Sequence, residues 1–175
     1  IDAPWTMEEY ALQIDDLADY YRYTTDFQAD FITTDLFLHA FHLVFDRMLQ
    51  KFERTYLAPG LEESMKTALS SLAGIEGACA SAGAEKTWRT VRDMFSIPLA
   101  LLEEKPGTRT KLSGNAAEEV RRILSAPDVT ASPVPGGTID SPAFLPRGHS
   151  TLRPALARYF RAMSWLGLAE LVLFA

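Results

Sequence analysis

Four polar side chains recur at helical spacing in the segment TDLFLHAFHLVFD, which is otherwise strongly apolar. They are Asp35, His39, His42 and Asp46, separated by four, three and four residues. At about 100° per residue, this spacing places the four side chains on one narrow stripe of a helix. A carboxylate next to an imidazole fixes the tautomer of the imidazole and makes it a stronger metal ligand. The stripe could therefore bind a divalent metal ion or move protons.

Two interpretations of this stripe stay open. In the first, His39, His42 and Asp46 bind a divalent metal ion, the one cofactor that the sequence suggests. His149 is then a further candidate ligand, although the spacing matches no diagnostic zinc motif. In the second, the stripe is a structural network, because buried carboxylates and imidazoles pair with one another in many proteins without any activity. The metal content of the protein separates the two interpretations.

The third histidine of the chain lies in the segment PRGHST, within a region rich in proline and glycine. Arg147 and His149 flank Gly148 there, directly before the last expected helix. A helix N-terminus beside an arginine is suited to binding an anion. We therefore regard Arg147 and His149, together with Asp35, as candidate ligand-binding residues. If this segment folds back over the 34–56 helix, Arg147 or His149 meets the stripe.

A hydrolase acting on glycans or on another substrate is a further alternative. Asp35 is then the general base, and His39 or His42 shuttles the proton. Arg147 and His149 would bind the transition state. The sequence contains no P-loop and no GxGxxG, GxSxG or HExxH motif, which argues against the common enzyme classes. Whether the chain is an enzyme stays open on the sequence alone.

The composition excludes several classes of protein. Hydrophobic residues make up 47% of the 175 residues and charged residues 23%, which is typical of one globular domain. The formal net charge is −6, whereas a nucleic-acid-binding protein normally has a basic excess. The single cysteine, Cys79, excludes a disulfide within the chain and a site built from several cysteines.

Helical periodicity extends through most of the chain and predicts an all-α fold, a helical bundle or a helical array. Residues 127–151 hold five of the ten prolines and are expected to form one long irregular loop. No segment shows the alternation typical of a strand. We expect one domain or part-domain over 1–175, with helices at about 7–23, 34–56, 61–82, 86–104, 115–125 and 152–174.

Local signals place the helix boundaries. Thr6 and Glu9 form a capping box before the first helix. Pro59-Gly60 is expected to stop the second helix, and Pro98 to kink or break the fourth. The second helix is apolar all round, which predicts that it is buried. The first helix is amphipathic, with apolar residues at Met7, Tyr10, Ala11, Ile14, Leu17, Ala18 and Tyr21 and with acidic residues between them.

The C-terminal residues 162–175 are almost wholly apolar, with Glu170 as their one charge. A helix end needs capping and a polar exit. We therefore expect the chain to be part of a larger protein and this segment to pack against a protein partner or against further sequence. A membrane span needs about 20 apolar residues, so none is expected in this chain.

Three segments of the sequence resemble a large bacterial and archaeal family of unknown function. They are FITTDLFLHAFHLVFDRML (31–49), FLPRGHST (144–151) and YFRAMSWLGL (159–168). The resemblance implies an exported or lipid-anchored envelope protein, longer than this chain. The family pattern has Tyr, Met and Arg where this chain has Ser150, Ser164 and Leu168. The residues that fall in the characteristic segments are Asp35, His39, His42, Arg147, His149, Tyr159 and Arg161.

The leading hypothesis is a non-catalytic, extracytoplasmic all-α module that binds a partner or ligand or has a structural role. The 127–151 loop and the apolar C-terminal segment are its expected binding surfaces, and the location outside the cytoplasm follows from the resemblance alone. The metal site is the second hypothesis and the hydrolase the third.

Overall fold

A computed structural model describes residues 34–125 and 129–168 of the chain. The chain divides into two units, Ile1–Leu49 and Gln50–Ala175, and each is described by itself. The helix expected over 7–23 and the residues of the last helix beyond 168 lie outside the described residues.

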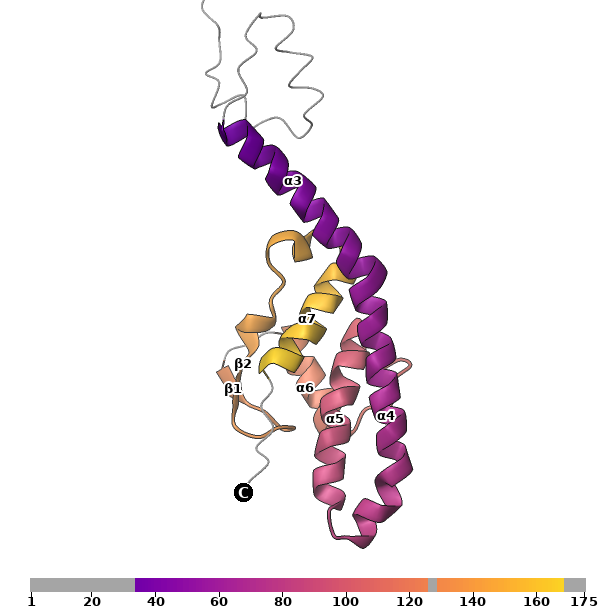
Figure 1. The fold of residues 1–175 in the computed structure, drawn as a ribbon. Coiled ribbons are helices and arrows are strands. Elements are labelled where there is room, and N and C mark those ends of the chain that lie inside the picture. Colours follow the sequence, from indigo (N-terminus) through magenta and orange to yellow (C-terminus); the bar gives the residue numbers. More distant parts are fainter. Residues whose placement is uncertain (1–33, 126–128, 169–175) are drawn as a thin grey trace, which may run out of the picture. The chain divides into compact units, whose positions relative to one another are not determined.

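The described chain is helical almost throughout, which confirms the all-α class (Figure 1). The predicted helices over 34–56, 61–82, 86–104, 115–125 and 152–174 correspond to five observed ones, and a π-helical turn, η1 (Glu53–Leu57), separates the first two. The five are α3 (Thr34–Phe52), α4 (Ala58–Ser81), α5 (Glu85–Leu102), α6 (Gly114–Ser125) and α7 (Pro154–Leu168). Within the described ranges, no helix is long and apolar enough to cross a membrane.

The predicted helix stop at Pro59-Gly60 is wrong. The chain passes through η1 directly into α4, and Pro59 lies in the first turn of α4. Pro59 has no N–H to donate, so the continuous helix lacks one hydrogen bond at this position. The wider π-helical turn before it changes the hydrogen-bond pattern at the position where the proline ring would clash with an α-helical carbonyl.

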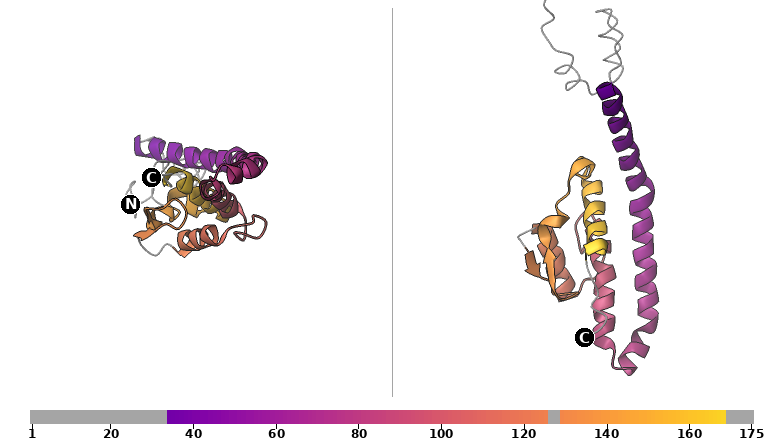
Figure 2. Two further views of the ribbon diagram at one scale, coloured as in Figure 1. Left: turned by 90° about the horizontal axis from the view of Figure 1, so that it is seen from below. Right: turned by 60° about the vertical axis from the view of Figure 1, so that its left-hand side comes forward.

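Helices α4 and α5 lie side by side as a hairpin (Figures 1 and 2). The turn between them contains Gly83 with a φ of +72°, a left-handed conformation that favours glycine. Trp88, near the start of α5, is buried, and its indole N–H donates to the carbonyl oxygen of Leu72 on α4 at 2.8 Å. This hydrogen bond and the burial of the ring join the two helices near their turn.

The core of the second unit lies between α5, α6, α7 and the segment that follows α6. Figure 2 shows α4 on one side of α5 and the segment after α6 on the other. Pro98 does not break α5, because the helix is continuous from Glu85 to Leu102. The buried cluster consists of Met94, Ile97, Ala100, Leu101, Ala116, Val120, Ile123, Val134, Ile139, Phe144, Ala162 and Trp165.

The region predicted as an irregular loop contains a small β-hairpin. Strands β1 (Val129–Ala131) and β2 (Thr138–Asp140) pair antiparallel, with Val129 opposite Asp140. Two short 3-10 helices follow, η2 (Ser141–Phe144) and η3 (Gly148–Thr151). Each strand has three residues, which is too short for an alternating pattern to be recognised in the sequence.

The apolar sequence of α3 predicted that this helix is buried on all sides, and this prediction is wrong. Among its side chains only Leu36 is buried. Its larger apolar side chains are exposed, by 64% for Phe37 and 67% for Val44. A helix surface of this kind is typical of an interaction face.

Candidate functional site

The characteristic segments 144–151 and 159–168 lie next to each other in the second unit, because η3 packs against α7. The chain is extended at Arg147 and then turns at Gly148, whose φ is +57°. Only glycine adopts this conformation without strain. The side chains on either side of this turn differ in exposure: Arg147 is exposed, whereas His149 is partly buried.

His149 forms a hydrogen-bonded pair with Glu53 of the π-helical turn η1. The imidazole Nε2 lies 3.0 and 3.1 Å from the two carboxylate oxygens of Glu53. The side chains are 22% and 17% exposed, so the pair is largely shielded from water. A shielded pair between segments far apart in sequence fixes the position of η3 on η1.

The negative charge of Glu53 acts on the phenol of Tyr159, which lies on α7. The tyrosine side chain is buried, and burial together with the negative charge of Glu53 raises the pKa of its phenol above the ordinary value. Glu53, His149 and Tyr159 therefore form one cluster, to which η1, η3 and α7 contribute one residue each.

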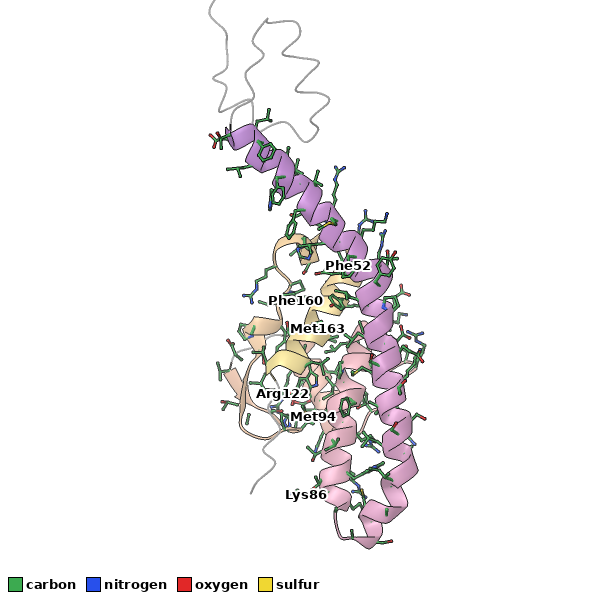
Figure 3. All side chains as sticks on the ribbon, viewed as in Figure 1. Phe52, Lys86, Met94, Arg122, Phe160 and Met163 are labelled. Atoms are coloured by element: carbon green, nitrogen blue, oxygen red, sulfur yellow. The ribbon has the colours of Figure 1, made fainter. Side chains whose placement is uncertain are left out.

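Arg147 presents a cation beside an aromatic ring. Its guanidinium carbon lies 5.8 Å from the centre of the Phe160 ring, a cation–π contact. Met163, one helical turn after Phe160, is 43% exposed on α7 (Figure 3). Leu145 and Leu152, on either side of this segment, are 52% and 63% exposed. We call Leu145, Arg147, Leu152, Phe160 and Met163 the Arg147 surface.

Arg161 directly follows Phe160 in the sequence and lies on α7. It is partly buried, and burial lowers the pKa of its guanidinium below the ordinary value. Its position in the middle of α7 places it within the characteristic segment 159–168.

The predicted stripe lies on α3, in the first unit. The Nε2 atom of His42 lies 3.5 Å from a carboxylate oxygen of Asp46, and His42 is 66% exposed. Asp35 is exposed in the first turn of α3, where the helix dipole favours a carboxylate. His39 is partly buried and takes part in further interactions. The stripe is therefore only partly shielded from water, unlike the His149–Glu53 pair.

The metal alternative finds no support in the geometry. Among the residues that the structure describes, no three His, Cys, Asp or Glu side chains are grouped as a metal ion requires. His149, the further candidate ligand, is instead paired with Glu53. The metal site and the hydrolase stay predictions from the sequence.

Two cavities of the second unit are lined by other residues than the predicted ones. The larger, of about 510 Å³, lies between α5 and the start of α6 and is lined on α5 by Lys86, Arg89 and Arg92. The smaller, of about 420 Å³, lies between α4, α5 and the loop after α5 and is lined there by Glu103. The charged side chains of the first are mostly paired, Arg89 with Glu85 and Arg92 with Asp93.

Glu53 was missed in the sequence analysis, although a signal for it exists. Glu53 lies seven residues after Asp46, so it continues the helical stripe of Asp35, His39, His42 and Asp46 by two turns. The sequence led us to expect that Arg147 or His149 meets the stripe itself, whereas His149 pairs with Glu53, which is not one of its four residues. Only the tertiary structure distinguishes Glu53 from the others.

A comparison with protein families gives one match, and it covers the three characteristic segments. No curated protein and no solved structure matches the chain. Residues 7–174 match a family described as a protein of unknown function, DUF3160. Because this match covers nearly the whole sequence, the chain belongs to the DUF3160 family.

Proposed function

We propose that this chain is a non-catalytic module that binds a protein partner through the Arg147 surface. The observation that supports the proposal most is the position of Arg147, which is exposed and yet held against the ring of Phe160. Arginine and aromatic side chains are enriched at protein interfaces, because they combine a large apolar area with a polar contact. The guanidinium fits a carboxylate of the partner, and the exposed leucines fit apolar side chains beside that carboxylate.

The His149–Glu53 pair supports the same proposal. His149 follows the turn at Gly148, and its pairing with Glu53 attaches the segment to η1. The backbone that carries Arg147 is therefore held in place. A preorganised surface loses less conformational entropy on binding than a mobile loop. His149 is then a positioning residue and not a ligand for the partner.

A location outside the cytoplasm is part of the proposal and rests on the resemblance stated above. Proteolysis of intact cells tests it. Protease added to the medium, or to cells with a permeabilised outer membrane, should degrade the native protein while a cytoplasmic marker stays intact. Protection of both proteins would contradict this location.

Site-specific photo-crosslinking tests the binding surface. A photoreactive residue replaces Leu152 in the native cells, and the matched control replaces Ile75, an apolar residue of α4 that is 49% exposed. We expect a discrete crosslinked protein from position 152 alone. Arg147→Glu should reduce that crosslink about tenfold, which corresponds to the loss of roughly 1.4 kcal/mol of binding.

The control for the charge change is Lys86→Glu. Lys86 lies near the start of α5, and Figure 3 shows it well apart from Phe160 of α7. It should leave the crosslink unchanged, since it reverses a charge of the same sign outside the Arg147 surface. Equal crosslinking from positions 152 and 75, or an unchanged crosslink in Arg147→Glu, would overturn the proposal.

A further inference from the structure

The smaller cavity of the second unit is lined by more cationic than anionic side chains. Its volume is about 420 Å³, and it lies between α4, α5 and the loop of residues 103–113 that follows α5. Four of its lining residues are basic and two are acidic. We call it the Arg92 cavity, and its charged lining residues are Glu62, Lys66, Arg92, Glu103, Arg109 and Lys111.

Both acidic residues of the Arg92 cavity already have partners. The ammonium group of Lys66 lies 2.8 Å from a carboxylate oxygen of Glu62, one helical turn away on α4. Glu103 is 2% exposed, and its two oxygens accept hydrogen bonds from the backbone N–H groups of residues 108–110. These two carboxylates are therefore not available to the remaining cations of the cavity.

Arg109 and Lys111 are cations without an acidic partner. Both side chains are exposed, and neither takes part in an ion pair within the part of the chain that the structure describes. They line the cavity from the loop of residues 103–113, whose backbone is held by its hydrogen bonds to Glu103. Unpaired cations at the mouth of a cavity raise the local concentration of anions.

Arg92 of α5 is held in a fixed position in the wall of the cavity. Its guanidinium carbon lies 5.3 Å from the centre of the Trp88 ring, and one terminal nitrogen donates to a carboxylate oxygen of Asp93 at 3.0 Å. The side chain is still 34% exposed. Its buried Nε–H has no acceptor among the described residues, so the guanidinium makes fewer hydrogen bonds than its five donors allow.

We propose that the Arg92 cavity binds a small organic anion, whose carboxylate or phosphate group is held by Arg92, Arg109 and Lys111. Arginine and lysine side chains bind such groups through charge-assisted hydrogen bonds. Leu69 and Leu99 provide an apolar part of the wall, so the ligand carries a short apolar body beside its charged group. Small-molecule sites have volumes of about 300–1,000 Å³, and the cavity falls within this range.

The larger cavity is a weaker candidate for the same chemistry. Its two arginines are paired with acidic residues of the same cavity, Arg89 with Glu85 and Arg92 with Asp93. Asp93 also accepts a hydrogen bond from the hydroxyl of Ser113, so an internal carboxylate already lies at the start of α6. The inference for the smaller cavity uses none of the residues of the Arg147 surface and does not depend on the partner proposed for that surface.

An NMR titration of the full-length chain tests the proposal, with butyl phosphate and butyrate as probes. Both carry a short alkyl chain and differ in the anionic group, so the tighter probe identifies the group that the site prefers. Butanol has a similar alkyl chain without a charge and is the control probe. With the anions at up to about 10 mM, we expect saturable shifts of amide resonances around the cavity, in residues 92–111, and none with butanol.

Three variants of the loop locate the binding site. Arg109→Gln and Lys111→Gln should each raise the dissociation constant about tenfold, because each removes one charged donor. Both side chains are exposed and unpaired, so the variants should keep the dispersed spectrum of the folded protein. The matched control is Lys105→Gln, which removes an exposed cation of the same loop that does not line the cavity. It should leave the dissociation constant unchanged.

Four results would overturn the proposal. The absence of saturable shifts with both anions would show that the cavity binds no organic anion. Equal binding of butanol would show an apolar site without a role for the cations. Unchanged binding in both Arg109→Gln and Lys111→Gln would place the anion elsewhere. Equal weakening by Lys105→Gln would show that the charge of the whole loop attracts the anion and that the cavity does not bind it.

Discussion

The indole N–H of Trp165 donates to the main-chain carbonyl oxygen of Met94 at 2.9 Å, inside the core. In an α-helix this carbonyl would accept a hydrogen bond from the N–H four residues later, which is position 98. Position 98 is a proline and has no N–H. Trp165 therefore supplies the donor that Pro98 lacks, and it does so from α7. This explains how α5 passes through Pro98 without leaving a buried carbonyl unpaired.

The first prediction follows from this relationship. Trp165→Phe removes the donor and leaves the Met94 carbonyl buried and unpaired, so we expect a loss of about 2–3 kcal/mol in the free energy of unfolding. Pro98→Ala restores an N–H at position 98. In that background Trp165→Phe should cost about 1 kcal/mol less, because the carbonyl keeps a partner. Urea unfolding of the four proteins measures the difference, and an equal loss in both backgrounds would contradict the assignment.

The second prediction concerns Glu103 at the end of α5, which is 2% exposed. Burial opposes ionisation, but hydrogen bonds from the backbone N–H groups of Arg109 and Thr110 and from the Thr110 and Thr108 hydroxyls lower the pKa of Glu103 below its ordinary value. Its stabilising contribution is therefore complete above the unfolded-state pKa and is lost as the pH falls through the lower folded-state pKa.

We expect Glu103→Gln to lower the free energy of unfolding at pH 7 by about 1–3 kcal/mol, because several donors lose a charged acceptor. The wild-type protein should lose stability below about pH 4.5, and the variant should lose less over the same range. Glu104→Gln is the control, since Glu104 is exposed and adjacent. Parallel pH profiles for Glu103→Gln and wild type would show that Glu103 does not organise the loop.

The third prediction has the opposite sign. Glu119 of α6 is 1% exposed, and burial raises the pKa of its carboxyl above the ordinary value in spite of a hydrogen bond from the Ser132 hydroxyl. A raised folded-state pKa means that ionisation works against the folded state. The wild-type protein should therefore gain stability from this group as the pH falls toward and below the folded-state pKa.

Glu119→Gln keeps an acceptor for Ser132 and removes the charge. We expect it to raise the free energy of unfolding at pH 7 and to abolish the gain at lower pH. Glu118→Gln is the contrasting variant, because the Arg121 and Arg122 side chains lower the pKa of that partly buried carboxyl to about 2, so its removal should decrease stability at pH 7 instead of increasing it. A loss of stability at pH 7 in Glu119→Gln would mean that the ionised carboxylate is needed to hold the hairpin turn.

Much of the fold could be predicted from the sequence because helical periodicity is a local property. The all-α class and the positions of α5 and α6 follow from side chains three and four residues apart, and nothing distant changes them. The stop predicted at Pro59 failed because proline in a first turn and proline as a terminator look alike in sequence. The hairpin was missed because its three-residue strands show no pattern of their own; they are held by contacts of β1 with η2 and by a hydrogen bond from Arg122 of α6 to the carbonyl oxygen of Ala131.

The candidate site was predictable only in part. Arg147 and His149 were named as candidates from the sequence, but the pairing of His149 with Glu53 depends on a contact across 96 residues of sequence. The same helix offers Asp35, Asp46 and Glu53 at equivalent angles, so periodicity cannot select among them. What selects Glu53 is the packing of α7 against both η1 and η3, which brings His149 to Glu53.

The last prediction compares two histidine–carboxylate pairs within the described part of the chain, His149–Glu53 and His42–Asp46. A double-mutant cycle with His149→Gln and Glu53→Gln should give a coupling of about 1–2 kcal/mol, because the pair is mostly shielded and spans two distant segments. The matched cycle with His42→Gln and Asp46→Gln should give about 0.5 kcal/mol or less, since that pair is local and exposed. Hydrogen exchange should show faster exchange of the η3 amides in His149→Gln only. Equal coupling in the two cycles, or unchanged exchange in η3, would mean that the His149–Glu53 pair does not hold the Arg147 surface in place.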